Sequence, residues 1–412
     1  MTLRSIDEHL AAILATVRAT PVEPVPIEDA LGRVLAEPVS AAVDLPGFTN
    51  SAMDGYAVRA ADCAGARPEQ PVELPVSGDI AAGDTREHVL EPGSCWRIMT
   101  GAALPARADA VVPVEHSDGG TARVALTLAP EPGQHVRRQG EDVRAGEEIL
   151  PAGVLISPGR LALAAAANVA QLAAHTRARV AIISTGDELC DPGSELERGQ
   201  IVDSNSLMLA ALVRASGAVP VRLPRSRDDA AALKAALAEA AEVADLVLTT
   251  GGVSMGAYDT VKEVLADSGT VDFVKVAMRP GMPQGHGTIG AGAVPLITLP
   301  GNPLSALVSF QVFVLPAIAA LHGRAGSAQT WRAGARELST GAGWRSVAGK
   351  TEFTRVILRD GLVWPAAGQG SHMVGALSGA SALAIVPPEC AEIAEGTVVE
   401  CLPILGAEGG LW

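Results

Sequence analysis

The sequence predicts a multidomain protein with a central, doubly wound α/β domain and β-rich regions before and after it. From residue 176 onwards, strands that are apolar almost throughout, such as "ARVAIIS" and "DLVLTT", alternate with helical stretches. Parallel strands that are covered by helices on both faces have this pattern. Before residue 133 and after residue 323, short alternating runs are separated by Gly, Pro and Asp, which is typical of all-β structure.

The first part of the chain is expected to form an elongated helical domain with a β-rich insertion. An amphipathic helix opens the chain, and a second helix is expected from about Pro158 to Ala167. Between them lie the strand-like runs "QPVELPVSGDI", "GSCWRIMTG", "DAVVPVE" and "ARVALTLAP". The expected units are a discontinuous helical domain, 1–43 with 133–175, and an inserted β-rich module, 44–132.

The remaining units are an α/β domain, 176–323, and a C-terminal β domain, 324–412. In the α/β domain, "SNSLMLAALVRASG" reads as a helix capped by Ser204 or Asn205 and ended by Gly217. "RDDAAALKAALAEAAEVA" and "YDTVKEVLADSG" read as further helices. The last zone consists of short strands and is expected to be a small barrel or sandwich.

Composition excludes several classes of protein. The chain of 412 residues is 48% hydrophobic and 19% charged, so it can bury substantial cores. Its formal net charge of −15 argues against a nucleic-acid partner. The five dispersed cysteines form no CxxC pair, which suits a reducing cytoplasm and gives no zinc site. The apolar stretch Pro303–Leu321 carries polar residues and a second proline, so a buried helix is expected there and no membrane span.

Three strands of the α/β domain end in polar turns, "STGDEL", "TTGGVSMG" and "LPGNPLSA". Ligands of open α/β sheets bind beyond the carboxyl ends of the strands, so these turns are candidate binding segments. Their candidate residues are Thr185, Gly186, Asp187, Glu188, Thr250, Gly251, Gly252, Ser254, Asn302 and Ser305.

Each turn alone has a purely structural explanation, because tight turns need glycine whatever their purpose. Three turns on one sheet edge, two of them with acids, favour a phosphate-bearing ligand and a metal. Asp259 is expected early in a helix, where a carboxylate is favoured by the helix dipole and is available to a divalent cation.

Further charged residues stand outside the three turns. Lys275 and Arg279 flank an extended run and could face an anionic ligand; alternatively they are solvated charges on an exposed strand. In the β-rich zone and just after it, Asp54, Thr100 and Asp142 lie in loops that also contain glycine.

Nine ordered motifs carry a resemblance to a known family. They are "NSAMDGYAVR", "RIMTGAALPARADAVVPVE", "QGEDVRAGE", "STGDEL", "GQIVDSN", "TTGGVSMGAYD", "RPGMPQ", "LPGNPLSA" and "GQGSH". In this order they resemble the molybdopterin molybdenumtransferase family, from Asn50 to about His372.

The resemblance implies an enzyme that inserts molybdate into adenylylated molybdopterin, releases AMP and forms molybdenum cofactor with Mg²⁺ or a similar divalent ion. The chemistry needs a cation to neutralise the departing phosphate, and acids to supply protons as molybdate loses oxo groups. It also implies a cytoplasmic homodimer with active sites shared between subunits, with other proteins of molybdenum cofactor biosynthesis as expected partners.

The matching motifs imply roles for individual residues of this chain. The expected catalytic residues are Asp54, Thr100, Asp142, Glu188 and Asp259, of which Glu188 and Asp259 would hold the metal. The expected substrate-binding residues are Thr185, Gly186, Asp187, Thr250, Gly251, Gly252, Ser254, Lys275, Arg279, Pro300, Asn302, Pro303, Ser305, Arg355 and Ser371, and Asp228 is a looser match.

One departure from the family pattern stands out. Family members commonly read "KPGKP" where this chain has "RPGMP", so Met282 replaces a cation. Two alternatives stay open beside the transferase: a molybdopterin adenylyltransferase-like enzyme, which would lack the first and last β regions, and a non-catalytic scaffold or paralogue like the gephyrin E domain.

Overall fold

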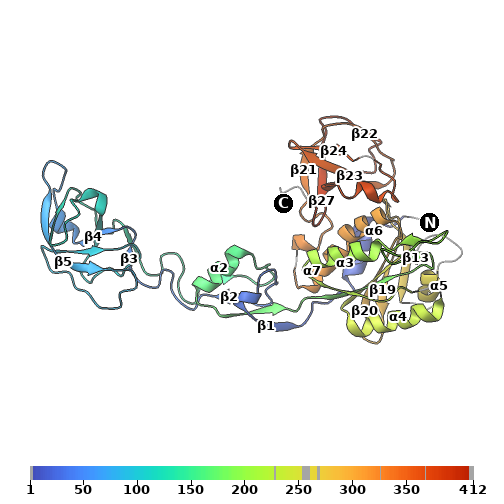
Figure 1. Ribbon diagram of the computed structural model, residues 1–412, viewed down its shortest axis with the longest axis horizontal. Helices are drawn as coiled ribbons and strands as arrows, with labels where there is room; N and C mark the ends of the chain where they lie inside the picture. The colour runs from blue at the N-terminus through green and yellow to red at the C-terminus, as the bar shows by residue number, and fades with distance from the viewer. Residues whose placement is uncertain are drawn as a thin grey trace.

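The computed structural model describes residues 3–226, 229–252, 260–266, 270–324, 326–366 and 368–407. The chain is elongated (Figure 1). A β module lies at one end, thin strand pairs and one helix form the middle, and the α/β domain with the C-terminal β domain form the other end.

The central sheet has six strands in the order β15-β12-β16-β20-β19-β17. The first four run parallel, and the last two are antiparallel to their neighbours. The doubly wound prediction is confirmed, with an antiparallel edge that the sequence pattern did not reveal. A four-residue link joins β19 to β20, and such a short connection can join only antiparallel strands. The bounds are β12 Arg179–Ser184, β15 Val219–Arg222, β16 Leu246–Thr250, β17 Val271–Lys275, β19 Pro283–Ile289 and β20 Val294–Leu299.

Helices cover both faces of this sheet, which explains its apolar strands. Along β12, Ile182 faces one core with Leu209 of α3, whereas Ile183 faces the other core with Leu233 of α4. Both cores exclude water, so alternate positions of the strand are equally apolar. The helices are α3 Asn205–Ala215, α4 Ala230–Val243, α5 Thr260–Ala266 and α6 Pro303–Ser309.

The apolar stretch Pro303–Leu321 is a core helix, as predicted. It comprises α6, a π-helical segment Phe310–Val314 and α7 Leu315–Leu321. It is long and apolar enough to cross a membrane, but 89% of its most apolar window is buried inside the protein.

The sequence predicts helix α1 (Ile6–Leu14) in one domain with the helix near Pro158. In the structure, α1 packs elsewhere. Its apolar face, with Ile6, Leu10 and Ile13, joins the core around the Pro303–Leu321 helix. That helix offers a much larger apolar surface than α2 (Pro158–Ala166), which buries only Ala164. The start of the chain therefore belongs to the α/β core.

The β module and the middle of the chain consist of strands joined by turns. The module has a five-stranded sheet, β7-β4-β6-β5-β8, and the middle has the antiparallel pairs β1–β11 and β2–β10. The bounds are β1 Val22–Pro26, β2 Val39–Ser40, β3 Asn50–Ser51, β4 Gly55–Val58, β5 Val72–Ile80, β6 Cys95–Ile98, β7 Ala110–Pro113, β8 Arg123–Leu126, β9 Val136–Arg137, β10 Glu148–Leu150 and β11 Gln171–His175.

The C-terminal domain is a six-stranded β structure that includes one strand from the α/β region. Strand β18 (Met278–Arg279) pairs in parallel with β23, so the sheet crosses from one domain to the next. The other strands are β21 Arg336–Ser339, β23 Thr351–Arg359, β24 Leu362–Pro365, β25 Ala382–Val386 and β27 Val398–Pro403. A small antiparallel pair, β22 Trp344–Arg345 with β26 Glu392–Ile393, completes this domain. Another small pair, β13 Leu189–Cys190 with β14 Ile201–Val202, belongs to the α/β domain and lies between β12 and α3 along the chain.

Two buried histidines make the fold sensitive to acid. Burial, reinforced by nearby His286, lowers the pKa of His9 to about 3, and both of its ring nitrogens lack a hydrogen-bond partner among the described residues. Burial lowers the pKa of His322 to about 4, and its Nε2 accepts a hydrogen bond from the Ala178 amide at 3.1 Å. Both side chains therefore fold in the neutral form.

We predict that this protein loses stability as the pH falls from 7 to 5. The unfolded histidine takes up a proton near pH 6.5 while the folded one does not, so each buried histidine costs about 2 kcal/mol at pH 5. In thermal unfolding, His9→Leu should reduce the pH dependence of Tm, whereas His116→Gln, at an exposed position, should leave it unchanged. Equal pH dependence in wild type and His9→Leu would contradict the assignment.

Candidate functional site

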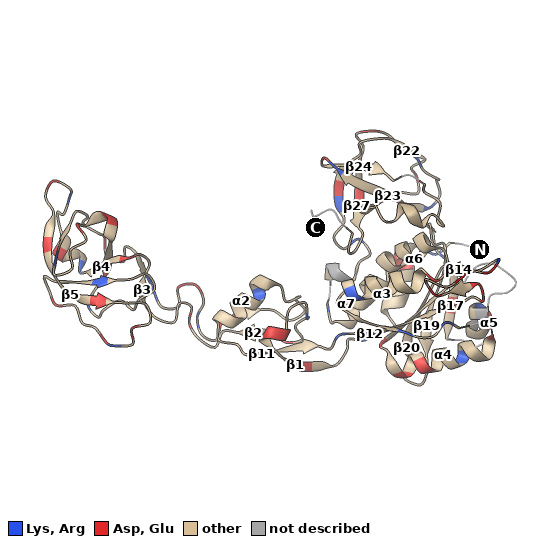
Figure 2. Cartoon of the chain, in the orientation of Figure 1, with Lys and Arg blue, Asp and Glu red and all other residues tan. Residues whose placement is uncertain are grey.

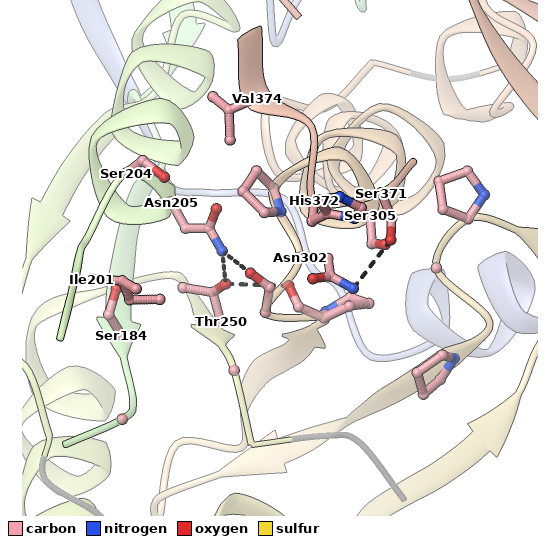
Figure 3. Close-up of a pocket in the computed structure, with 18 of the residues that line it drawn as sticks. Ser184, Ile201, Ser204, Asn205, Thr250, Asn302, Ser305, Ser371, His372 and Val374 are labelled. Carbon is pink, nitrogen blue, oxygen red and sulfur yellow. Dashed lines mark hydrogen bonds between the residues drawn. The ribbon is translucent and has the colours of Figure 1, made fainter. Parts of the chain in front are cut away.

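A cavity of about 1120 Å³ lies at the carboxyl edge of the central sheet. The register of the sheet sets Ser184 beside Thr250 and Thr250 beside Leu299, so the three polar turns begin side by side. The turns form one wall, and a loop of the C-terminal domain, 369–374, forms another (Figure 3). The sequence-based expectation that the three turns share one edge agrees with this geometry.

Asn205 ties the turns together. Its Nδ2 donates to Thr250 Oγ1 at 2.9 Å and to the Gly301 carbonyl at 2.7 Å, while the Thr250 hydroxyl donates to the Pro300 carbonyl at 3.3 Å (Figure 3). The helix that starts here is capped by neither Ser204 nor Asn205 through a side-chain bond; Asp203 Oδ1 accepts from the Ser206 amide at 3.0 Å.

Two glycines let the second turn approach the first. Gly251 has φ +94°, and a Cβ there would lie 2.8 Å from the Thr185 carbonyl oxygen. Gly252 has φ +65°, and a Cβ there would lie 2.4 Å from Val261 Cγ2. Both positions thus exclude larger residues by conformation and by space.

The C-terminal loop is held over the cavity by backbone and side-chain bonds. Asn302 Nδ2 donates to Ser371 Oγ at 3.2 Å, and the Leu304 amide donates to the Ser371 carbonyl at 3.2 Å (Figure 3). The guanidinium of Arg355, which is fully buried, donates to the carbonyls of Met373 at 2.8 Å, Gly370 at 3.2 Å and Gly368. Arg355 therefore positions the loop and does not reach the cavity surface.

Three buried polar atoms in the cavity wall have no hydrogen-bond partner among the described residues. They are Ser184 Oγ, Asp203 Oδ2 and Asn205 Oδ1, on side chains exposed by only 2%, 3% and 9%. Buried polar atoms are almost always paired, so these atoms are suited to a polar ligand. Sequence reasoning assigned no binding role to these three residues and treated Asn205 only as a candidate helix cap, although "GQIVDSN" was among the recognised motifs and "IIS" directly precedes the first turn.

Twelve of the expected site residues line the cavity. They are Thr185, Gly186, Glu188, Thr250, Gly251, Gly252, Arg279, Pro300, Asn302, Pro303, Ser305 and Ser371. Asp187, Lys275 and Arg355 are absent from its lining, and Ser254, Asp259 and Asp228 lie outside the described residues. Lys275 stands on β17, at the far edge of the sheet from β12.

The expected residues of the N-terminal part are remote from the cavity within one chain (Figure 1). Asp54 Oδ1 accepts from the Thr100 amide at 2.6 Å and from Thr100 Oγ1 at 2.8 Å, so these two residues do meet. The backbone bond above all, then the hydroxyl bond, lowers the pKa of Asp54. Asp142 is exposed in the segment that leaves the module.

The charges around the cavity are mixed. Glu188, Asp203 and Glu352 contribute carboxylates, and Arg279 contributes a guanidinium whose Nε lies 4.0 Å from Glu352 Oε1. Across the chain, Lys and Arg are scattered over every part in the view of Figure 2. Any anionic ligand of the cavity is therefore bound by local amides and single cations, because the net charge of the chain repels it.

Comparison with known proteins gives matches along almost the whole chain. The family descriptions "MoeA N-terminal region (domain I and II)", "Probable molybdopterin binding domain" and "MoeA C-terminal region (domain IV)" match residues 4–168, 181–320 and 337–404. Molybdopterin molybdenumtransferase 2 of Mycobacterium tuberculosis (strain CDC 1551 / Oshkosh) is 45% identical over 407 residues, which cover 97% of this chain and 99% of that protein. The chain belongs to the molybdopterin molybdenumtransferase family.

Other members of the molybdenumtransferase family agree in extent and in fold. The molybdopterin molybdenumtransferase of Bacillus subtilis (strain 168) is 34% identical, with 99% of this chain and 95% of the relative covered. The solved molybdopterin biosynthesis moeA protein of Pyrococcus horikoshii OT3 superposes with a TM-score of 0.85 at 28% identity, covering 98% of this chain and 100% of that chain. The resemblance carried by the nine motifs is thus confirmed.

We predict that Asn205→Ala loosens the cavity wall. The change removes two hydrogen bonds and leaves the buried Thr250 hydroxyl and Gly301 carbonyl without this partner, at a cost of about 1–3 kcal/mol. Hydrogen exchange of the turns after β16 and β20 should accelerate. Ser204→Ala is the matched control, because the Ser204 side chain makes no capping bond; equal exchange in both variants would contradict this role.

Proposed function

We propose that the chain is a molybdopterin molybdenumtransferase, which inserts molybdate into adenylylated molybdopterin and releases AMP. The observation that carries the proposal is the composite cavity, where three strand-end turns and a C-terminal loop enclose unpaired buried polar atoms in a chain of this family. The cavity's size suits a nucleotide-sized ligand.

The turns suit the phosphates of the substrate. Gly251 and Gly252 allow the backbone to approach a phosphate without a side chain between them. We assign the phosphates of the substrate to this edge of the sheet. Ser305 and Ser371 line the part of the cavity that lies between the α/β domain and the C-terminal domain.

The donor set fits a divalent ion such as Mg²⁺. Asp203 Oδ2 has no hydrogen-bond partner in the part of the chain that the structure describes, and Glu188 lines the same cavity. Mg²⁺ in proteins is bound by one or two carboxylates together with substrate phosphates and water. Asp203 and Glu188 would hold the ion, which when bound would neutralise charge on the departing AMP. Asp259 remains a proposed ligand from its motif alone.

Proton transfer is the second task of the site. Each oxo group that leaves molybdate as water takes up two protons, and the two thiols of molybdopterin that bind molybdenum lose two protons, so groups that relay these protons must stand beside the reacting atoms. Glu188 in the cavity and Asp54 of the module are the proposed groups. Asp54, with its lowered pKa, is held as a carboxylate by Thr100, which suits it to accept a proton and pass it on.

The proposed enzyme is a homodimer with shared sites. Asp54, Thr100 and Asp142 are remote from the cavity of their own chain, so they can reach a cavity only on a second copy (Figure 1). We further propose that the enzyme works in the cytoplasm with other proteins of molybdenum cofactor biosynthesis.

We predict that AMP release from adenylylated molybdopterin depends on molybdate and Mg²⁺, and that Asp203→Asn lowers its rate by about 100-fold or more. The amide keeps the acceptor for Ser206 and removes the charge. Glu195→Gln, at an exposed position, should release AMP at the wild-type rate. Molybdate-independent release in wild type, or full activity in Asp203→Asn, would refute the corresponding part of the proposal.

We predict that two inactive variants restore activity when their subunits are exchanged. Asp54 in the β module and Glu188 in the cavity lie at opposite ends of the elongated molecule, so a mixed dimer of Asp54→Ala and Glu188→Ala has one site with both defects and one with neither. Random exchange should give about a quarter of the wild-type activity, because half of the dimers are mixed. Activity that stays at the level of the separate variants would contradict shared sites.

A further inference from the structure

The wall of the cavity between the two domains contains a chain segment in which Met282 stands where the family pattern has a cation. Residues 279–283 line the cavity, and Arg279 is the only cation among them. Its guanidinium lies near Glu352, and its side chain is 51% exposed. Met282, in the same segment, offers only a thioether to the cavity.

Lys350 of the C-terminal domain reaches this position from the other side of the domain boundary. Its Nζ lies 3.3 Å from Met282 Sδ, in a half-buried environment. A thioether is a weak acceptor, and no carboxylate of the described residues lies within ion-pair distance of this ammonium group. The ammonium group therefore lies against Met282, a residue of the cavity wall, with its hydrogen-bonding capacity largely unused.

The backbone fixes Lys350 at this place. Met278 pairs with Thr351 in the β18–β23 ladder, and the Thr351 amide donates to the Ala277 carbonyl at 3.1 Å. Lys350 directly precedes β23, and Met282 lies three residues after the end of β18, so both residues flank the ladder. The nearby Glu352 is occupied, since its Oε2 accepts from Ser346 Oγ at 2.6 Å and from the Val347 amide at 3.0 Å.

We propose that Lys350 binds a tetrahedral oxyanion of the substrates at Met282, so that a cation from the C-terminal domain completes the charge of this wall. The proposal rests on the proposed function, which brings two such anions to the cavity: free molybdate and the phosphate of the nucleotide. A flexible lysine stem allows the ammonium to leave the thioether and follow either anion.

The test measures equilibrium binding of sodium molybdate and of AMP, separately, to the full-length protein by calorimetry. Lys350→Met should weaken binding of one of the two anions by about ten-fold or more, and the anion affected identifies the source of the oxyanion. Lys262→Met is the matched control, because Lys262 is exposed on α5, and it should bind both anions like wild type.

A charge exchange separates binding from folding. The double variant Met282→Lys with Lys350→Met returns the cation to the same wall from the other domain, and it should regain affinity to within about three-fold of wild type. Unchanged binding in Lys350→Met, or a double variant as weak as Lys350→Met, would overturn the proposal for Lys350 alone. A wild-type protein that binds neither anion would overturn both this proposal and the proposed function.

Discussion

The register of three buried parallel strands is the constraint on which the site depends. Ser184, Thr250 and Leu299 stand side by side only because β12, β16 and β20 pair without a shift. A slip of one residue would turn each strand's side chains to the opposite face, and both cores would lose their fit. Hydrophobic burial on two faces thus fixes the place where three polar turns meet, and Asn205 then bonds across them.

The second half of the site comes from a separate unit that is fixed just as firmly. Arg355 donates from a buried position to three carbonyls of one glycine-containing loop, which holds the loop on a single path. Ser371 then meets Asn302 and the start of the Pro303–Leu321 helix. Burial lowers the pKa of Arg355, and the hydrogen bonds to those carbonyls offset the cost of burying the guanidinium. The charge of Arg355 thus stabilises the loop.

Local pattern was enough to predict the turns and the helices of the α/β domain, and together with the family resemblance it predicted twelve residues of the cavity lining. It failed where distant segments decide. Nothing in the amphipathic pattern of α1 names its partner, and the largest apolar surface, the helix Pro303–Leu321, lies some three hundred residues away in sequence. Lys275 and Arg279 looked equivalent, but only the turn after Arg279 bends into the cavity. The unpaired oxygens of Asp203 and Ser184 became visible only in the structure, where no described residue is their hydrogen-bond partner.

The core of the α/β domain also extends into the domain that follows it. Phe353, Leu383 and Leu402 belong to the same apolar cluster as α1, α3 and the Pro303–Leu321 helix. Removing the chain after residue 323 would therefore expose a large apolar face of what remains and leave β18 without its neighbour. The boundary between the two domains separates two types of fold, but it does not separate two hydrophobic cores. We therefore expect the α/β domain, the first helix and the C-terminal domain to unfold and to resist proteolysis as one cooperative unit, from which the β module at the far end can be separated.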